Sequence, residues 1–255
     1  MAQYTQRPMR FLEKIVQSIS EQILPTACIS CQQFQTETIC HACLENLHWN
    51  SLINYECCFQ CGIPLHSSEL PSKRCDHCTK SEPFFDKTYC LDRYDGILQD
   101  ALHQLKYQKR IACAHGLARA WNKVIADPLD FNEVGYLIPV PLSQEKLHTR
   151  GFNQSWELAR RIDCAPIQKL PRLLKRHHHA EHQVGSTLTA RQDAVREMFY
   201  IDDRYIGLMK NKTVIVFDDV MTTGATLNEI ARILKESGVS LVINWVLLRT
   251  TRPPQ

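Results

Sequence analysis

The chain has 255 residues, of which 44% are hydrophobic and 22% are charged. This composition excludes an intrinsically disordered protein and supplies enough apolar residues for one large domain and one small one. The formal net charge of +3 is too small to indicate nucleic-acid binding, so any basic surface must come from the local distribution of charge.

The first 25 residues predict an amphipathic helix. Leu12, Ile15 and Ile19 recur at intervals of three and four residues, and Pro25 ends the pattern. Charged residues interrupt these apolar positions, so the segment does not resemble a signal peptide. The apolar stretch at 241–248 is far shorter than the roughly 20 residues of a membrane span. We therefore expect a cytoplasmic protein without membrane insertion.

Residues 26–86 predict a small zinc-ribbon domain. The chain contains twelve cysteines, and in a reducing compartment cysteines with suitable spacing favour metal binding over disulfides. Two sulfurs of a C-x-x-C turn can reach one tetrahedral Zn²⁺, and a second turn closes the site. Four such turns follow one another: Cys28 with Cys31, Cys40 with Cys43, Cys58 with Cys61, and Cys75 with Cys78. We expect one or two structural zinc ions.

The grouping of the four cysteine turns stays open at the level of sequence. The simplest arrangement joins each turn to its neighbour and makes two sites, while interleaved and single-zinc arrangements are the alternatives. Three further residues could serve as ligands: Cys57, His41 and His77. The other three cysteines are expected to be inert buried thiols: Cys90, Cys113 and Cys164.

Residues 87–255 predict an α/β domain with a mostly parallel sheet, because strand-like and helix-like segments alternate. We expect a helix capped by Asp95 that carries the apolar residues from 97 to 105, and further helices at 112–125, 153–162 and 227–237. Strands are expected at 136–140, near 167, at 213–217 and at 241–248. Gly238 suits the carboxyl-terminal cap of the last helix, and the His-rich stretch at 177–182 predicts a mobile loop.

The segment from Val214 to Thr226 reads as a buried strand, an acidic pair, a loop of small residues and the start of a helix. A phosphate at that helix end would meet free backbone N–H groups, a favourable dipole and threonine hydroxyls. Gly224 allows the backbone to come close to the ligand. The acidic pair suits ribose hydroxyls, which donate to carboxylates. The loop lacks the G-x-x-x-x-G-K-[ST] pattern of a Walker A site, and an ordinary capped turn is the alternative.

This segment resembles the signature of type I phosphoribosyltransferases that binds phosphoribosyl pyrophosphate (PRPP). In that family, catalysis relies on holding PRPP and Mg²⁺ while a nucleophile displaces pyrophosphate from ribose C1. The sequence agrees, because it offers no nucleophile–base–orienter triad. The resemblance assigns PRPP binding, together with Mg²⁺, to seven residues: Asp218, Asp219, Thr222, Thr223, Gly224, Ala225 and Thr226.

Two further strings narrow the resemblance. I-P-V-P-L-S at 138–143 and R-G-F-N-Q at 150–154 are similar to signatures of the ComF family, competence-associated proteins also called ComFC or GntX. Those proteins also carry amino-terminal C-x-x-C turns before a phosphoribosyltransferase domain. The L-K-Y triplet at 105–107 and the spacing of Arg176, Gln183 and Arg191 fit the same family. Ser186 and Ala194 depart from its pattern.

The resemblance implies roles for residues outside the phosphate loop. It places a pyrophosphate loop at 140–143, with Leu142 and Ser143, and a flexible basic loop at 175–191 that closes over PRPP. The expected pyrophosphate and flexible-loop residues are Leu142, Ser143, Arg150, Arg176, Gln183 and Arg191. A solvated surface loop is the alternative for these arginines, and Lys106 suits either ligand binding or a helix surface.

Two functions compete. The ComF resemblance implies a protein of natural transformation that binds PRPP and single-stranded DNA, with the competence helicase and the recombinase loader as partners. Residues 140–200 contain ten Lys and Arg against six Asp and Glu, an excess that could follow a DNA backbone. Tyr107, Phe152 and Trp156 are candidates for base stacking, with core packing as the alternative. The second function is an active phosphoribosyltransferase with an unidentified acceptor.

Overall fold

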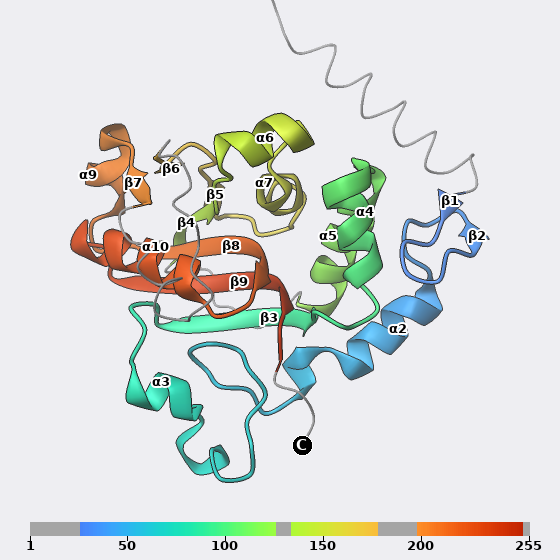
Figure 1. Ribbon diagram of the computed structural model, residues 1–255, viewed down its shortest axis with the longest axis horizontal. Coiled ribbons are helices and arrows are strands. Elements are labelled where there is room, and N and C mark those ends of the chain that lie inside the picture. The colour runs from blue at the N-terminus through green and yellow to red at the C-terminus, as the bar shows by residue number, and fades with distance from the viewer. Residues whose placement is uncertain (1–25, 126–133, 178–197, 252–255) are drawn as a thin grey trace, which may run out of the picture.

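A five-stranded parallel sheet lies at the centre of the protein, with its strands in the order β3-β9-β8-β4-β5 (Figure 1). The structure is a computed structural model that describes residues 26–125, 134–177 and 198–251. The sheet strands are β3 (Lys87–Arg93), β4 (Val134–Pro139), β5 (Gln168–Lys169), β8 (Thr213–Met221) and β9 (Leu241–Arg249). The prediction of a mostly parallel sheet is therefore confirmed.

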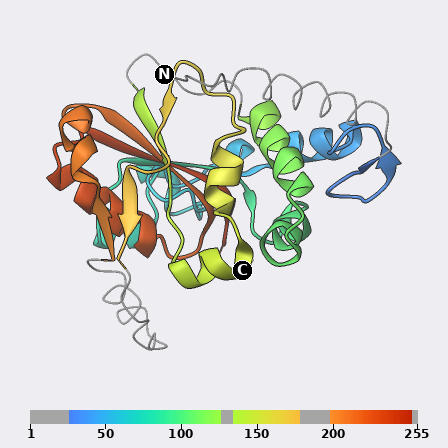
Figure 2. The same cartoon turned by 90° about the horizontal axis from the view of Figure 1, so that it is seen from above.

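Helices cover both faces of this sheet (Figure 2). The helices are α2 (His41–Asn50), α3 (Asp76–Lys80), α4 (Gln99–Gln108), α5 (Ala112–Val124), α6 (Gln144–Arg150), α7 (Gln154–Ala159), α9 (Ile206–Met209) and α10 (Ala225–Glu236). Short 3-10 turns lie at Leu52–Asn54, Leu70–Ser72 and Asp203–Tyr205. Two small antiparallel pairs complete the described elements: β1 (Thr26–Ala27) with β2 (Phe34–Gln35), and β6 (Leu174–Arg176) with β7 (Phe199–Ile201).

The central strand β8 is buried on both faces because its first residues are apolar without alternation. Successive side chains point to opposite faces, so Ile215 and Phe217 join the core with α4, α5 and α7. Val214 and Val216 join the second core, with α10. The strand expected at 213–217 continues to Met221, which places the acidic pair at its carboxyl end.

Most predicted elements match the structure, with one wrong start. The helix expected to be capped by Asp95 begins instead at Gln99, with Leu98 at its N-cap, because a turn in which the Gly96 N–H donates to the Arg93 carbonyl precedes it. The helix at 153–162 is shorter, and Asn153 caps it. Gly238 follows α10 with φ +88°, as expected for a helix end.

The cysteine-rich residues pack into the two cores beside the sheet. Ile29, inside the first C-x-x-C turn, lies against α5 so closely that a Cβ on Gly116 would be 2.7 Å from its Cδ1 atom. Cys58 and Phe85 are buried in the core with α10. Figure 1 shows β1, β2 and α2 beside α4 and α5, with α3 below β3. The division into domains at residues 26–86 and 87–255 stays a prediction.

The first two residues of the expected basic loop at 175–191 belong to a strand. Lys175 and Arg176 lie on β6, where they pair with Tyr200 and Phe199 of β7, because backbone pairing at this ribbon orders them. Gln183, Arg191 and most of the His-rich stretch lie outside the described residues, as does the predicted helix at 1–25. Within the described ranges, no helix has the length and apolar character to cross a membrane.

Candidate functional site at the carboxyl end of β8

The eight cysteines of the C-x-x-C turns form two tetrads. The first tetrad is Cys28, Cys31, Cys40 and Cys43, and the second is Cys58, Cys61, Cys75 and Cys78. In each tetrad the sulfur atoms lie within 4.8 Å of one another. This is the simplest arrangement expected from the sequence, in which each turn joins its neighbour. The spare candidates Cys57, His41 and His77 are not members of either tetrad.

The spacing of the sulfurs fits zinc. Four thiolates about 2.3 Å from a tetrahedral Zn²⁺ lie ~3.8 Å apart, and the Sγ atoms of Cys31 and Cys40 are 3.8 Å apart. Those of Cys61 and Cys75 are 3.6 Å apart. The Cys43 N–H donates to Cys40 Sγ at 3.4 Å. Both tetrads could therefore hold a structural zinc ion.

Three of the four cysteines outside the tetrads are buried thiols. Burial raises the pKa of Cys113 and Cys164 and raises that of Cys90 further. The prediction that these three are inert is consistent with their burial. Cys57, which is partly buried, has its pKa raised by burial to about 12.

A connected network of side chains from distant parts of the chain surrounds the carboxyl end of β8. Lys106, on α4, makes an ion pair with Asp219. Gln154, on α7, donates from Nε2 to Asp219 Oδ1 at 3.2 Å. The Oε1 atom of Gln154 accepts from Arg150 Nη1 at 2.8 Å, and the Arg150 guanidinium lies 5.5 Å from the centre of the Tyr107 ring. The network joins the L-K-Y triplet, the R-G-F-N-Q string and the acidic pair.

The two carboxylates of the acidic pair have different surroundings. The Asp219 side chain is 6% exposed and contacts Lys106, whereas Asp218 is partly exposed. The Ser155 hydroxyl lies 3.2 Å from Asp218 Oδ1 and 3.3 Å from Asp219 Oδ1 and can donate to either. The Asp219 N–H donates to Asp218 Oδ1 at 2.9 Å. Asp219 is therefore the more buried of the two carboxylates, and Asp218 is the more exposed.

Their titration follows from these surroundings. Burial, together with the adjacent Asp219 carboxylate, raises the pKa of Asp218 well above its usual value. Burial acts to raise the pKa of Asp219, but the Lys106 ammonium and the hydrogen bonds from Lys106, Gln154 and Asp218 together outweigh it, so the pKa is lowered. Asp219 is thus the charged centre of the network. Asp218 is the carboxyl whose ionised form gains most from an added cation or hydroxyl donor.

The turn after β8 presents free backbone donors. Gly224 is the N-cap of α10 with φ +83°, a conformation that favours glycine, and a Cβ there would lie 2.6 Å from Met221 Cε. The N–H groups of Gly224, Thr226 and Leu227 make no hydrogen bond to any residue in the described ranges. Unpaired donors at a helix start are suited to an anion such as phosphate.

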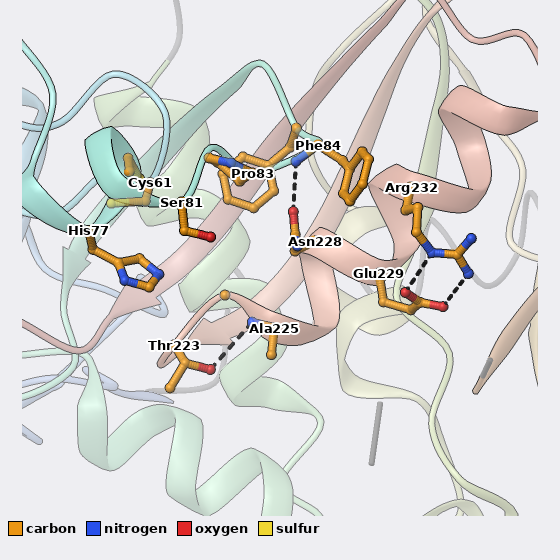
Figure 3. Close-up of a pocket in the computed structure, with 13 residues that line it drawn as sticks. Cys61, His77, Ser81, Pro83, Phe84, Thr223, Ala225, Asn228, Glu229 and Arg232 are labelled. Carbon is orange, nitrogen blue, oxygen red and sulfur yellow. Dashed lines mark hydrogen bonds and ion pairs between the residues drawn. The ribbon is translucent and has the colours of Figure 1, made fainter. Parts of the chain in front are cut away.

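Hydroxyls and a small cavity accompany these donors. Thr223 Oγ1 accepts from the Ala225 N–H at 3.3 Å, and Thr222 is exposed while Thr226 is partly exposed. A pocket of about 340 Å³ lies in front of Thr223 and Ala225. Figure 3 shows His77, which lies on α3 within the second tetrad's last turn, and Ser81, which follows α3, on the opposite wall.

The predicted pyrophosphate loop is held by α7. Asn153 accepts the N–H groups of Ser155 and Trp156 at the start of α7 and donates from Nδ2 to the Val140 carbonyl at 2.9 Å. The Ser143 hydroxyl accepts the Lys146 N–H at 3.3 Å and caps α6. Leu142 and Ser143 are partly exposed. The R-G-F-N-Q string therefore connects this loop with the acidic pair.

The sequence of this chain is similar to those of known competence and DNA utilization proteins. It is 30% identical over 203 residues to the DNA utilization protein YhgH of Salmonella typhimurium, an alignment that covers 76% of this chain and 84% of that one. The chain belongs to the ComF family. Its identity to competence protein F of Haemophilus influenzae is 28% over 236 residues, covering 87% of this chain and 96% of that one.

The family model described as "Phosphoribosyl transferase domain" matches residues 149–253. This range contains Arg150, Gln154 and the phosphate loop, whereas Lys106 and both tetrads precede it. A hypoxanthine phosphoribosyltransferase structure from Staphylococcus aureus aligns with a TM-score of 0.31 and 15% identity, over 53% of this chain and 62% of that one. That similarity is too low to support an assignment.

Three candidate residues from the sequence analysis are not part of this network: Arg176, Phe152 and Trp156. The Arg176 guanidinium is 5.8 Å from the centre of the Phe199 ring on the β6–β7 ribbon. Phe152 and Trp156 are partly buried against the core, so the core-packing alternative holds for these two. Tyr107 is 65% exposed and is the base-stacking candidate that the structure leaves accessible.

The structure adds two residues that the sequence did not indicate. Ser155 directly follows the R-G-F-N-Q string and lies between the two carboxylates, so an extension of that string would have found it. Arg249, the last residue of β9, donates from Nη1 to the Met221 carbonyl at 3.0 Å and also to the Thr222 carbonyl. No sequence pattern distinguishes this arginine.

Proposed function

We propose that the protein binds PRPP with Mg²⁺ at the carboxyl end of β8 and acts on single-stranded DNA that has entered the cytoplasm during natural transformation. The observation that carries the first part is the combination of a partly exposed carboxyl at Asp218 with free N–H donors at Gly224, Thr226 and Leu227. The carboxylate can accept hydrogen bonds from ribose hydroxyls, and the free N–H groups at the start of α10 can donate to a phosphate.

The 5-phosphate of PRPP suits the start of α10. There it would accept backbone N–H groups and threonine hydroxyls, and the dipole of α10 favours its negative charge. The ribose hydroxyls would donate to Asp218, while Asp219 stays paired with Lys106. This narrows the sequence prediction, in which both carboxylates meet the ribose. Mg²⁺ would accompany the pyrophosphate and neutralise its charge.

The competence role is supported by the names of the relatives. One is a competence protein F and another is a DNA utilization protein, and the alignments span most of each chain. Tyr107 and Arg150 support contact with DNA, since an exposed ring beside a guanidinium offers a stacking surface and a cation to a single strand. The competence helicase and the recombinase loader remain predicted partners.

Calorimetric titration of PRPP, with and without Mg²⁺, into the zinc-loaded protein tests the pocket. We expect Mg²⁺-dependent binding that Asp218→Asn and Thr223→Val each weaken about 10-fold, since each removes a charged or polar ligand contact. Asp163→Asn is a matched control, because Asp163 is exposed and bonds only Asn122 among the described residues. Binding that is unchanged in both test variants would contradict the assignment.

Binding of single-stranded DNA is tested by its dependence on salt. An affinity that falls steadily as the salt concentration rises is expected of phosphate contacts. Tyr107→Ala should weaken binding about 10-fold through lost stacking, with Tyr55→Ala, at another exposed tyrosine, as the comparison. Absence of binding at low salt would remove the DNA-handling role.

Phosphoribosyl transfer to an acceptor is a second candidate function, favoured by the match to the phosphoribosyl transferase domain at 149–253. It predicts release of pyrophosphate that depends on PRPP, on Mg²⁺ and on one member of a panel of bases and amines. A protein that binds Mg²⁺ and PRPP but releases no pyrophosphate with any acceptor would be a binding protein rather than an enzyme.

A further inference from the structure

The second cysteine tetrad and the phosphate loop share one buried side chain, Arg249. This arginine is 4% exposed, and Nε donates to the Cys61 carbonyl at 2.9 Å. Nη1 donates to the carbonyls of Met221 at 3.0 Å and Thr222, and to that of Thr250 at 2.8 Å. One guanidinium therefore connects a tetrad residue to the two residues with which the phosphate loop begins.

The bonding of Arg249 is unusual for a buried cation. Within the described ranges, no carboxylate lies at ion-pair distance from it, and backbone carbonyls satisfy its donors instead. A buried charge is costly unless its hydrogen bonds are made, so the guanidinium favours the arrangement in which these carbonyls keep their positions. A zinc ion bound by four thiolates carries a net negative charge, which would favour the nearby guanidinium.

Two further contacts connect the residues that follow the tetrad with the same loop. The Phe84 N–H donates to Asn228 Oδ1 on α10 at 2.7 Å, as Figure 3 shows. A Cβ placed on Gly224 would lie 3.8 Å from the Phe85 ring. The segment around Cys61 is itself fixed, since a Cβ on Gly62 would lie 2.6 Å from Cys90 Sγ of β3.

We infer that Arg249 is a positioning residue that couples the second tetrad to the phosphate loop, so that metal in this tetrad strengthens phosphate binding. The inference rests on the proposed function for its ligand, PRPP. Coupling between two sites is reciprocal. Bound PRPP therefore slows the loss of zinc from the second tetrad, and loss of zinc loosens residues 221–226.

Hydrogen exchange of the ligand-free protein measures the loop directly. Arg249→Lys keeps the charge but removes the forked donors, and we expect exchange at residues 221–226 to rise about 5-fold or more. Cys58→Ser should do the same by opening the second tetrad, whereas Cys28→Ser, in the first tetrad, should leave exchange at 221–226 as in the wild type. Arg161→Lys is the matched control, since Arg161 is also largely buried but bonds Glu157.

The second readout is the rate at which a coloured chelator withdraws zinc. Addition of PRPP with Mg²⁺ should slow release of one zinc ion about 5-fold in the wild type and in Arg161→Lys, but not in Arg249→Lys. A merely structural arginine would change the overall melting temperature without removing this effect of PRPP. Far-ultraviolet circular dichroism confirms that each variant is folded, and Arg249→Met replaces Arg249→Lys if the latter is not.

The outcomes separate the inference from the proposed function. Exchange at 221–226 that is unchanged in both Arg249→Lys and Cys58→Ser would overturn the coupling. A wild type that binds no PRPP, but whose loop loosens in those two variants, would contradict the proposed function and leave the coupling supported. Wild-type binding with an equal PRPP effect on zinc release in Arg249→Lys would overturn Arg249 as the connecting residue.

Discussion

Asp218 and Asp219 are neighbours at the end of β8 whose carboxylates share Ser155 but differ in burial and in their other partners. Asp219 points toward α4 and α7, where Lys106 and Gln154 bond it. Asp218 is partly exposed, and its Oδ1 atom accepts from the Asp219 N–H at 2.9 Å. Of these two neighbouring aspartates, Asp219 is therefore the charged partner of Lys106, and Asp218 is the carboxyl that we propose as the ribose ligand.

The first prediction concerns Asp218→Asn. Because the pKa of this carboxyl is raised, its ionisation in the folded protein carries a penalty that is absent below about pH 4 and complete above the folded pKa. Asparagine removes that penalty and keeps the oxygen that accepts from Ser155. We expect the variant to be more stable at neutral pH by about 1 kcal/mol, or roughly 2–4 °C in melting temperature.

Thermal unfolding between pH 4 and pH 8 measures this effect. The difference between Asp218→Asn and the wild type should grow as the pH rises, while binding of PRPP with Mg²⁺ is weakened about 10-fold. Such a gain in stability with a loss of binding is common at sites built for a ligand. A variant that is less stable at every pH would show that Asp218 is a structural residue.

The second prediction concerns Asp219→Asn. This change leaves Lys106, whose side chain is 14% exposed, without its counter-charge, and removal of one partner of a buried pair costs about 3 kcal/mol. Since the pKa of Asp219 is lowered, its stabilising contribution is complete above about pH 4 and is lost as the pH falls through the folded pKa. Denaturant unfolding at pH 7 and at pH 3 measures both effects.

An exposed ion pair provides the comparison for Asp219. Glu236, whose side chain is 62% exposed, pairs with Arg232 on the surface of α10. Glu236→Gln should change the free energy of unfolding by less than about 1 kcal/mol. Equal losses in Glu236→Gln and Asp219→Asn would mean that the network around Asp219 contributes no more than a surface contact.

At the scale of elements, the short helix α7 (Gln154–Ala159) holds two parts of the site through its first residues. Asn153 caps α7 and bonds the Val140 carbonyl, while Gln154 and Ser155 bond the acidic pair. The third prediction is that Asn153→Ala lowers the free energy of unfolding by about 2 kcal/mol. It should also weaken PRPP binding, because the loop from Val140 loses its support.

Ser143→Ala is the comparison for this prediction, in stability alone. Its hydroxyl makes one cap bond, to the Lys146 N–H of α6, so we expect a loss of about 0.5–1 kcal/mol in denaturant unfolding. A smaller loss in Asn153→Ala than in Ser143→Ala would contradict the double role of Asn153.

The sequence predicted those elements whose signals are local. The apolar runs of β8 and β9 and the glycine at Gly238 all act within a few residues of their own positions. The pair of Lys106 with Asp219 was not predictable, because it depends on how α4 packs beside β8. The same is true of β6, whose polar residues are ordered by pairing with β7 across a long stretch of chain.

At the scale of the whole molecule, the two tetrads belong to different cores. Cys28 is buried with α5 and the sheet face that carries Phe217, whereas Cys58 is buried with α10 and the face that carries Val216. The two tetrads are therefore packed with different faces of the sheet. Spacing in the sequence left their pairing open, because interleaved turns satisfy the same pattern, and it is the folded chain that brings particular turns together.

The fourth prediction is that the purified protein holds two zinc ions per chain, measured by elemental analysis beside protein concentration. The sulfur spacing fits one tetrahedral ion in each tetrad. Cys28→Ser and Cys58→Ser should each retain one ion, because each opens one tetrad and leaves the other closed. Cys113→Ser is the control that retains both, since Cys113 is a buried thiol outside the tetrads. One ion in the wild type, or the loss of both from either variant, would instead support a single or an interleaved site. Because structural zinc contributes directly to folding, Cys58→Ser should also unfold at a lower temperature than Cys113→Ser.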